Sequence, residues 1–200
     1  MKGIIFTTFV ELVEEKFGLQ TADYLIEEAK LQSEGAYTNV GTYDHTELMR
    51  MLQLLSEKTK LSQKELIFVY AQKLMGLFVV KYVGFFAGKD LFSFLKSIEN
   101  HVHVEVRKIY PEAELPTFAI REPSTGELVM EYRSDKPLAD LAEGLMRAAV
   151  DHFKEKVTVT VEDAEGKEKT VTVSKDEGPR AGTTLEGLAK LKPAFDKKGS

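Results

Sequence analysis

The sequence predicts an α+β fold, in which a helical N-terminal part is followed by a further helix and antiparallel strands. Three observations lead to this class. Apolar residues recur every three to four positions from residue 4 to about 109, the period of amphipathic helices. Beyond Pro111 and Pro116 the period changes to two, which is typical of strands. The helical period then returns once, between two pairs of strands.

The first three helices are predicted from their apolar faces and end signals. Ile5, Phe9, Leu12, Val13 and Phe17 share one face of a helix over 4–17 that Gly18 closes. Thr21 is placed to cap a second helix that runs to about Leu31, and a Gly- and Ser-containing loop follows. Asp44 then opens a third helix.

Two longer helices complete the helical part. Ser62 and Glu65 have the spacing of a capping box, and the segment 66–83 is apolar nearly all round, so we expect a buried helix in the centre of the domain. Another helix is expected over 91–109, with an inner stripe made by Phe92, Leu95, Ile98, Val102 and Val106.

Strand patterns then alternate with one more helix. The segments 117–122 and 127–134 read as a hairpin around the turn "PSTG". Pro137 starts a helix through Phe153, and 156–162 and 169–174 read as a second hairpin. A tail from Asp176 carries one short helical candidate over 185–191.

The composition narrows the class of protein. The chain has 200 residues, 43% hydrophobic and 30% charged, with a net charge of −5 and mixed signs, which argues against a nucleic-acid partner. It contains no cysteine, so disulfides and thiolate sites are excluded, which suits a cytoplasmic location. Acidic residues interrupt the apolar start, and Gln72, Lys73 and Lys81 interrupt the most apolar helix, so we expect neither export nor a membrane span.

Two groups of residues are candidates for chemistry. His103 lies at the edge of an apolar helix face, where a neutral imidazole binds a metal or simply packs in the core. Only Glu99 lies at helical spacing from it, so the protein alone supplies no complete metal site. Tyr132, Ser134 and Lys136 alternate along an extended segment and could hold an anionic ligand, although a solvated strand end has the same pattern.

Six ordered blocks place these candidates in a family. "MKGIIF", "GAYTNVGTYDHTEL", "GFFAG", "HVEVRKIYPEAELP", "YRSDKPLADLAEGL" and "DHF" resemble the heme nitric oxide/oxygen binding (H-NOX) domains of bacterial type, over about residues 1–155. The resemblance implies an H-NOX domain over 1–175, with antiparallel strands helping to enclose a buried heme b, and a C-terminal tail over 176–200.

The resemblance also assigns roles to individual residues. His103 corresponds to the proximal ligand of the heme iron. Tyr132 and Ser134 match the Tyr-x-Ser-x-Arg motif that holds the propionates, and Lys136 stands where the family has arginine. Lysine keeps the charge but lacks the planar fork that grips a carboxylate with two hydrogen bonds. Pro116 and Ile5 match residues that press on and bend the porphyrin, and each could instead be an ordinary helix stop or core residue.

The distal lining by resemblance contains no hydrogen-bond donor. Oxygen-binding members carry a tyrosine where this chain has Leu141, and the other matching positions are Phe9, Leu74, Phe78 and Leu145. Bound oxygen gains nothing from such a lining, whereas nitric oxide and carbon monoxide need no donor. Tyr70 would supply a donor if the register were different.

The resemblance implies a gas sensor rather than an enzyme. It implies binding of nitric oxide and carbon monoxide at ferrous heme, exclusion of oxygen, and control of a separate histidine kinase or cyclic-dinucleotide enzyme through a heme-linked conformational change. The alternatives are a heme-free module that binds a protein or a hydrophobic ligand, and an enzyme using Asp44 with His45 or Glu99 with His103 as an acid–base pair.

Overall fold

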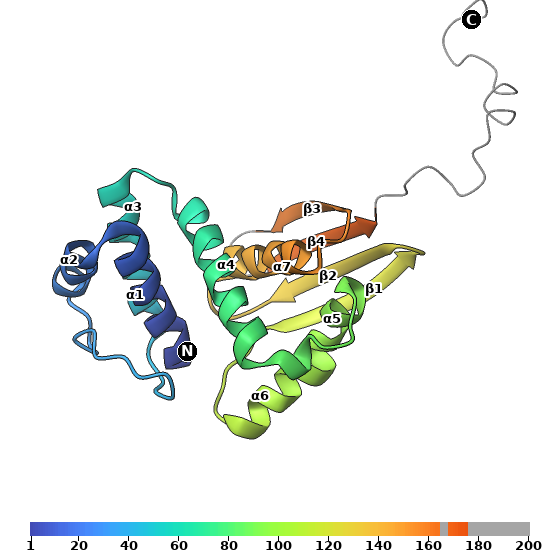
Figure 1. The fold of residues 1–200 in the computed structure, drawn as a ribbon, viewed down its shortest axis with the longest axis horizontal. Helices are drawn as coiled ribbons and strands as arrows, with labels where there is room; N and C mark the ends of the chain where they lie inside the picture. Colours follow the sequence, from blue (N-terminus) through green and yellow to red (C-terminus); the bar gives the residue numbers. More distant parts are fainter. Residues whose placement is uncertain (165–167, 176–200) are drawn as a thin grey trace, which may run out of the picture.

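The computed structural model describes residues 1–164 and 168–175, and it has the α+β architecture that the sequence predicts. In Figure 1 the first three helices form a lobe on one side, and the sheet lies on the other side with α5 and α7 next to it. The helix α4 runs between the two parts. The helical candidate at 185–191 lies outside the described residues.

The N-terminal lobe consists of α1 (Gly3–Phe17), α2 (Leu19–Ala29) and α3 (His45–Thr59). The cap predicted at Thr21 is wrong: α2 begins at Leu19, directly after Gly18 with its φ of 88°, and the Thr21 hydroxyl donates to the Phe17 carbonyl at 2.9 Å. Asp44 caps α3 as predicted, because its carboxylate accepts the Thr46 N–H at 2.8 Å.

The central helix α4 (Gln63–Lys81) starts with the predicted capping box of Ser62 and Glu65. Its buried residues lie between Leu66 and Met75, whereas Val80 is 81% exposed, so the prediction of burial holds only for the first part. At Gly144 of α7 (Ala139–Phe153) an added Cβ would lie 2.7 Å from the Ala71 Cβ. This glycine therefore lets α4 and α7 pack closely.

The predicted single helix over 91–109 is divided into three parts. A short 3-10 turn (Val83–Phe85) leads to α5 (Leu91–Ser97), a π-helical segment (Ile98–Val102) and α6 (His103–Ile109). The His103 N–H bonds to the Ile98 carbonyl, five residues earlier, instead of four. This extra residue in one turn changes which side chains of α6 face the sheet.

The sheet contains four antiparallel strands in the order β1-β2-β4-β3. They are β1 (Thr117–Ser124), β2 (Glu127–Arg133), β3 (Val157–Ala164) and β4 (Glu168–Lys175), close to the two predicted hairpins. Because paired residues of antiparallel strands project to one side, the buried face combines alternate residues of neighbouring strands. It includes Leu128, Met130, Tyr132, Val171 and Val173.

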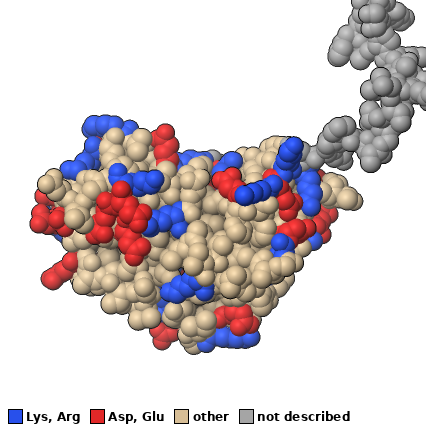
Figure 2. Space-filling view, in the orientation of Figure 1, with Lys and Arg blue, Asp and Glu red and all other residues tan. Residues whose placement is uncertain are grey.

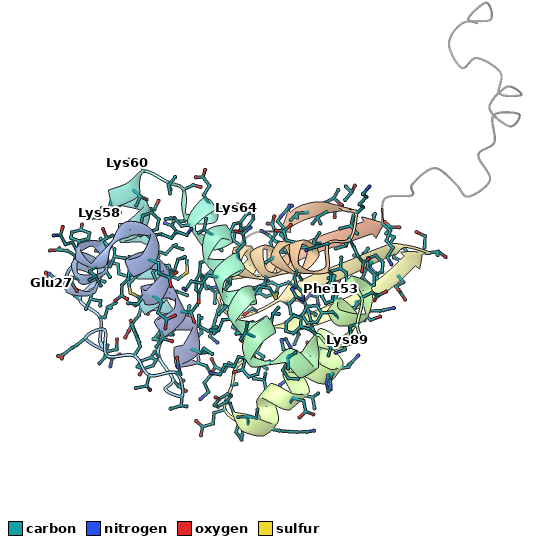
Figure 3. All side chains as sticks on the ribbon, in the orientation of Figure 1. Glu27, Lys58, Lys60, Lys64, Lys89 and Phe153 are labelled. Atoms are coloured by element: carbon teal, nitrogen blue, oxygen red, sulfur yellow. The ribbon has the colours of Figure 1, made fainter. Side chains whose placement is uncertain are left out.

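The apolar core consists of two adjoining clusters. One lies among α1–α4 and receives Leu138 and Leu141 from the start of α7, and the other lies among α5, α7 and the sheet. The side chains of Phe78 and Leu145 pack against both clusters. Figure 3 shows side chains filling the space between α1 and α4 that the ribbons leave open.

A buried ionic cluster joins α4, α7 and β4. The Glu143 carboxylate, which is 2% exposed, lies 2.8 Å from Lys169 Nζ, 2.9 Å from Arg147 Nε and 3.2 Å from Lys64 Nζ. These cations lower the pKa of Glu143 against the effect of burial. Lys64 lies at the first turn of α4 (Figure 3), so the cluster fixes the start of that helix to the sheet.

Candidate heme site

His103 is the first residue of α6 and is 8% exposed. Its Nδ1 lies 3.1 Å from Oε2 of Glu99, one π-helical turn earlier. No described protein group bonds to Nε2, yet among the described residues no fully buried side-chain nitrogen or oxygen lacks a partner. The Nε2 atom therefore retains accessible surface on a ring that is otherwise enclosed, as a ligand to a bound group requires.

The electrostatic surroundings keep this ring neutral. Burial lowers the pKa of His103, and the hydrogen bond that the ring donates to Glu99 only partly offsets that effect. A lowered pKa leaves the imidazole unprotonated at neutral pH, and only the unprotonated nitrogen can bind iron.

Phe118 connects the histidine to the predicted propionate residues, and the sequence did not single it out. Its ring centroid lies 5.8 Å from that of His103 and 5.6 Å from that of Tyr132. Its backbone N–H also donates to Glu99 at 3.2 Å. The inward-facing position in the alternating pattern of β1 was the only sequence signal for this role.

The predicted propionate residues lie at and beyond the end of β2. The strand ends at Arg133, so the expectation of one extended segment through Lys136 is wrong: Ser134 directly follows the strand, and Lys136 lies in the bend after it, where its N–H donates to Ser134 Oγ at 3.1 Å. Burial raises the pKa of Tyr132, and the nearby Ser134 hydroxyl opposes that rise. The two hydroxyls are therefore neighbours.

Lys136 makes an ion pair with the loop that precedes β1. Its Nζ lies 2.5 Å from Oε2 of Glu114, and its side chain is 14% exposed against 79% for Glu114. Pro116, two residues further, is half-buried and leads directly into β1. The ammonium group of Lys136 thus lies next to the carboxylate of Glu114 on a solvent-exposed loop.

The predicted distal residues lie in and around one apolar cluster. Phe9, Leu74 and Leu141 are buried members of the N-terminal cluster, and Phe78 and Leu145 are half-buried residues packed against it. Ile5, which was predicted to contact the porphyrin, is also half-buried against this cluster. Because Phe78 and Leu145 also pack against the cluster on the sheet, this lining lies where the two parts of the core adjoin. All six residues thus belong to the N-terminal cluster or pack against it.

The hydroxyl of Tyr70, the alternative distal donor, already has an acceptor. Tyr70 is 1% exposed, donates to the Ile5 carbonyl at 2.6 Å and packs edge-on against Phe9 at 5.3 Å. Burial raises its pKa well above the usual value, so the group remains a protonated donor to that carbonyl. A phenol has one proton to donate, and here it is used within the protein.

Other chemical constellations receive little support. His45 Nδ1 lies 3.4 Å from Asp44, whose side chain is 57% exposed and caps α3. Within residues 1–164 and 168–175 no group of three or more His, Asp or Glu side chains could hold a metal ion.

Positive and negative side chains are both scattered over the face shown in Figure 2. None of the helices in the described ranges is long and apolar enough to cross a membrane.

Comparison with known proteins identifies the family. The model of the Haem-NO-binding family matches residues 2–161. The chain belongs to this family. The unliganded ferrous H-NOX protein from K. algicida is 42% identical, covers 90% of this chain and 98% of its own, and superimposes with a TM-score of 0.83. The H-NOX from Shewanella woodyi, solved in its Fe(II)CO state, is 35% identical, covers 92% and 98%, and has a TM-score of 0.76.

A more distant H-NOX protein has the same fold. The protein from S. oneidensis in its Fe(II)NO state is 22% identical and superimposes with a TM-score of 0.80 over 88% of this chain and 99% of its own. The prediction of an H-NOX domain and of its α+β fold is therefore confirmed. The chain is a heme-binding gas-sensor domain of the H-NOX family.

The C-terminal part has a second similarity. The model of the N-terminal domain of thiolase matches residues 143–200. The peroxisomal 3-ketoacyl-CoA thiolase B from Rattus norvegicus is 66% identical over 44 residues, or 22% of this chain. The chain spans about a tenth of the length of the curated thiolases it matches. So short a match assigns no thiolase activity to the chain.

Proposed function

We propose that this H-NOX domain binds heme b through His103, senses nitric oxide in preference to oxygen, and also binds carbon monoxide. The observation that carries the proposal is the enclosed His103 ring, whose Nδ1 is bonded and whose Nε2 has no described protein partner. When bound, the heme supplies an iron atom to which a diatomic gas can bind.

The residues present fit a heme. A single imidazole suffices because the porphyrin supplies the other iron ligands. We assign the propionates to Tyr132, Ser134 and Lys136, which offer two hydroxyls and a cation near one another. We assign the faces of the porphyrin to Ile5 and Pro116, both half-buried, and to the apolar distal lining.

Selection against oxygen would follow from the distal lining. Phe9, Leu74, Phe78, Leu141 and Leu145 carry no polar side-chain atom, and the Tyr70 hydroxyl donates to Ile5 instead. Polarised oxygen on iron is stabilised by a hydrogen-bond donor, whereas nitric oxide binds without one. Reduced protein exposed to air should therefore show no stable oxygen complex in its absorption spectrum.

The signalling step belongs to the same proposal. His103 would hold the iron, and α6, which begins at His103 and reaches the sheet through Phe118, would link the bound heme to a conformational equilibrium of the domain. We propose a histidine kinase or a cyclic-dinucleotide enzyme as the separate protein that responds, and residues 1–175 as the heme-binding unit.

One substitution tests the proposal. His103→Gly should abolish the Soret band of the purified protein, and added imidazole should restore it, because free imidazole can take the place of the missing ring. His101→Gly is the matched control, since it puts the same glycine two residues earlier at an exposed position. A wild-type protein that takes up no heme would favour the heme-free module, whereas a His103→Gly variant that keeps its Soret band would show that another residue holds the heme.

A further inference from the structure

Glu99 is the closest polar partner of His103, and three neighbours fix its carboxylate. Oε2 lies 3.1 Å from His103 Nδ1 and accepts the Phe118 N–H at 3.2 Å. Oε1 lies 3.8 Å from a guanidinium nitrogen of Arg107. The Glu99 carboxylate is thus held by β1, by Arg107 and by the buried ring of His103, which limits its rotation.

The π-helical segment explains how these groups meet. Glu99 lies inside Ile98–Val102, and the extra residue in this turn changes the angle between Glu99 and the start of α6. Glu99 is half-buried and His103 buried, and both face β1, where Phe118 contacts each of them. Glu105 in α6 is also half-buried, but it pairs with Lys108 at 2.6 Å.

We propose that Glu99 is a positioning residue that sets the strength of the His103–iron bond, an inference that rests on the proposed function. Its carboxylate accepts the proton of Nδ1, which leaves the lone pair on Nε2 and makes that nitrogen a stronger donor. Arg107 and the Phe118 N–H stabilise the charge on Glu99 and so limit this effect. The strength of the His103–iron bond is thus tuned from β1 and α6.

The principal test compares Glu99→Gln with Glu105→Gln in the heme-loaded full chain. Glutamine keeps the size of the side chain and an acceptor for the Phe118 N–H but removes the charge, so the fold should persist. We expect the iron–histidine stretching band of the ferrous protein to move to lower wavenumber in Glu99→Gln and to stay in place in Glu105→Gln. Heme transfer to apomyoglobin should become about 10- to 100-fold faster, the range for partners of metal-bound histidines.

A second measurement needs no heme. Nitrogen NMR of the heme-free protein should show His103 with its proton on Nδ1, and Glu99→Leu should shift the ring toward the other tautomer. An unchanged stretching band in Glu99→Gln, or a wild-type ring with its proton on Nε2, would overturn the role of Glu99 while leaving heme binding intact. Absence of heme from the wild type would instead overturn the proposed function.

Discussion

The two sides of the candidate heme site are built differently. On the proximal side, His103, Glu99 and the Phe118 backbone form a chain of hydrogen bonds that joins a helix to the sheet. On the distal side, residues such as Phe9 and Leu74 belong to the apolar core and offer no polar side-chain atom. A histidine that binds a metal has to be held in place by its hydrogen-bond partners. A pocket that favours nitric oxide over oxygen has to lack hydrogen-bond donors. Under the proposed function, this difference in polarity would divide the two tasks between two parts of the fold.

The largest expected effect comes from the apolar side. Leu74→Ala should reduce the free energy of unfolding by about 2–5 kcal/mol, because Leu74 is fully buried and its truncation leaves a cavity. Val80→Ala on the same helix is the control: Val80 is 81% exposed, so the change should stay within about 0.5 kcal/mol. Urea denaturation measures both. Equal losses would mean that α4 is not held by its buried face.

A hydrogen-bond donor placed among the distal residues should remove the difference in polarity between the proximal and distal sides. Leu141→Tyr should stabilise bound oxygen by about 1.5–3 kcal/mol, the range for hydrogen bonds to charged groups, and give a stable oxygen complex in air. Leu141→Phe controls for ring size. Tyr70→Phe should leave the spectrum in air unchanged, because that hydroxyl serves Ile5. A change in oxygen binding in Tyr70→Phe would contradict our account of the distal side.

The cation assigned to the propionates gives a smaller effect. Lys136→Ala should speed heme loss by roughly tenfold, since one charge-assisted hydrogen bond contributes about 1.5 kcal/mol. Lys136→Arg should slow heme loss, because a guanidinium grips a carboxylate with two hydrogen bonds. Heme transfer to apomyoglobin measures both rates, with Glu114→Gln as a control for loss of the ion pair. A faster loss in Lys136→Arg would show that the cation does not reach the propionates.

The smallest effect concerns pH and the heme-free protein. Because burial lowers the pKa of His103 below 6.5, the unfolded chain takes up this proton at a higher pH than the folded one. The contribution of His103 to stability is therefore complete above pH 6.5 and is lost as pH falls toward the folded pKa. Proton NMR of the ring should give a midpoint below 6.5. A midpoint above it would mean that Glu99 outweighs burial.

Local signals in the sequence predicted most of the fold. The capping residues Asp44 and Ser62 act where their spacing indicated, because a cap depends on only a few neighbouring residues. The cap at Thr21 was wrong, since Gly18 allows a new helix to start directly after the previous one. The π-helical segment had no sequence signal, because apolar periodicity indicates a helix but does not encode one extra residue in a single turn.

The candidate site was predictable to a lesser extent. Matching blocks located His103 and the apolar residues, whereas the partners of each polar atom come from segments distant in sequence. Tyr70 and Ile5 are 65 positions apart, yet their hydrogen bond decides whether the phenol is free. Lys136 and Glu114 are likewise 22 positions apart. Sequence patterns thus indicate which residues gather at a site, and tertiary structure determines which hydrogen bonds they make.

The β3–β4 hairpin lies within the stretch that also matches thiolases, although in this structure it completes an H-NOX sheet. The strand β4 pairs with β2 through a row of backbone hydrogen bonds. It also contributes two buried valines (Val171 and Val173) to the core and one lysine that reaches α7. Any hairpin put in its place would have to keep the pairing with β2, both buried valines and the lysine that reaches Glu143 of α7.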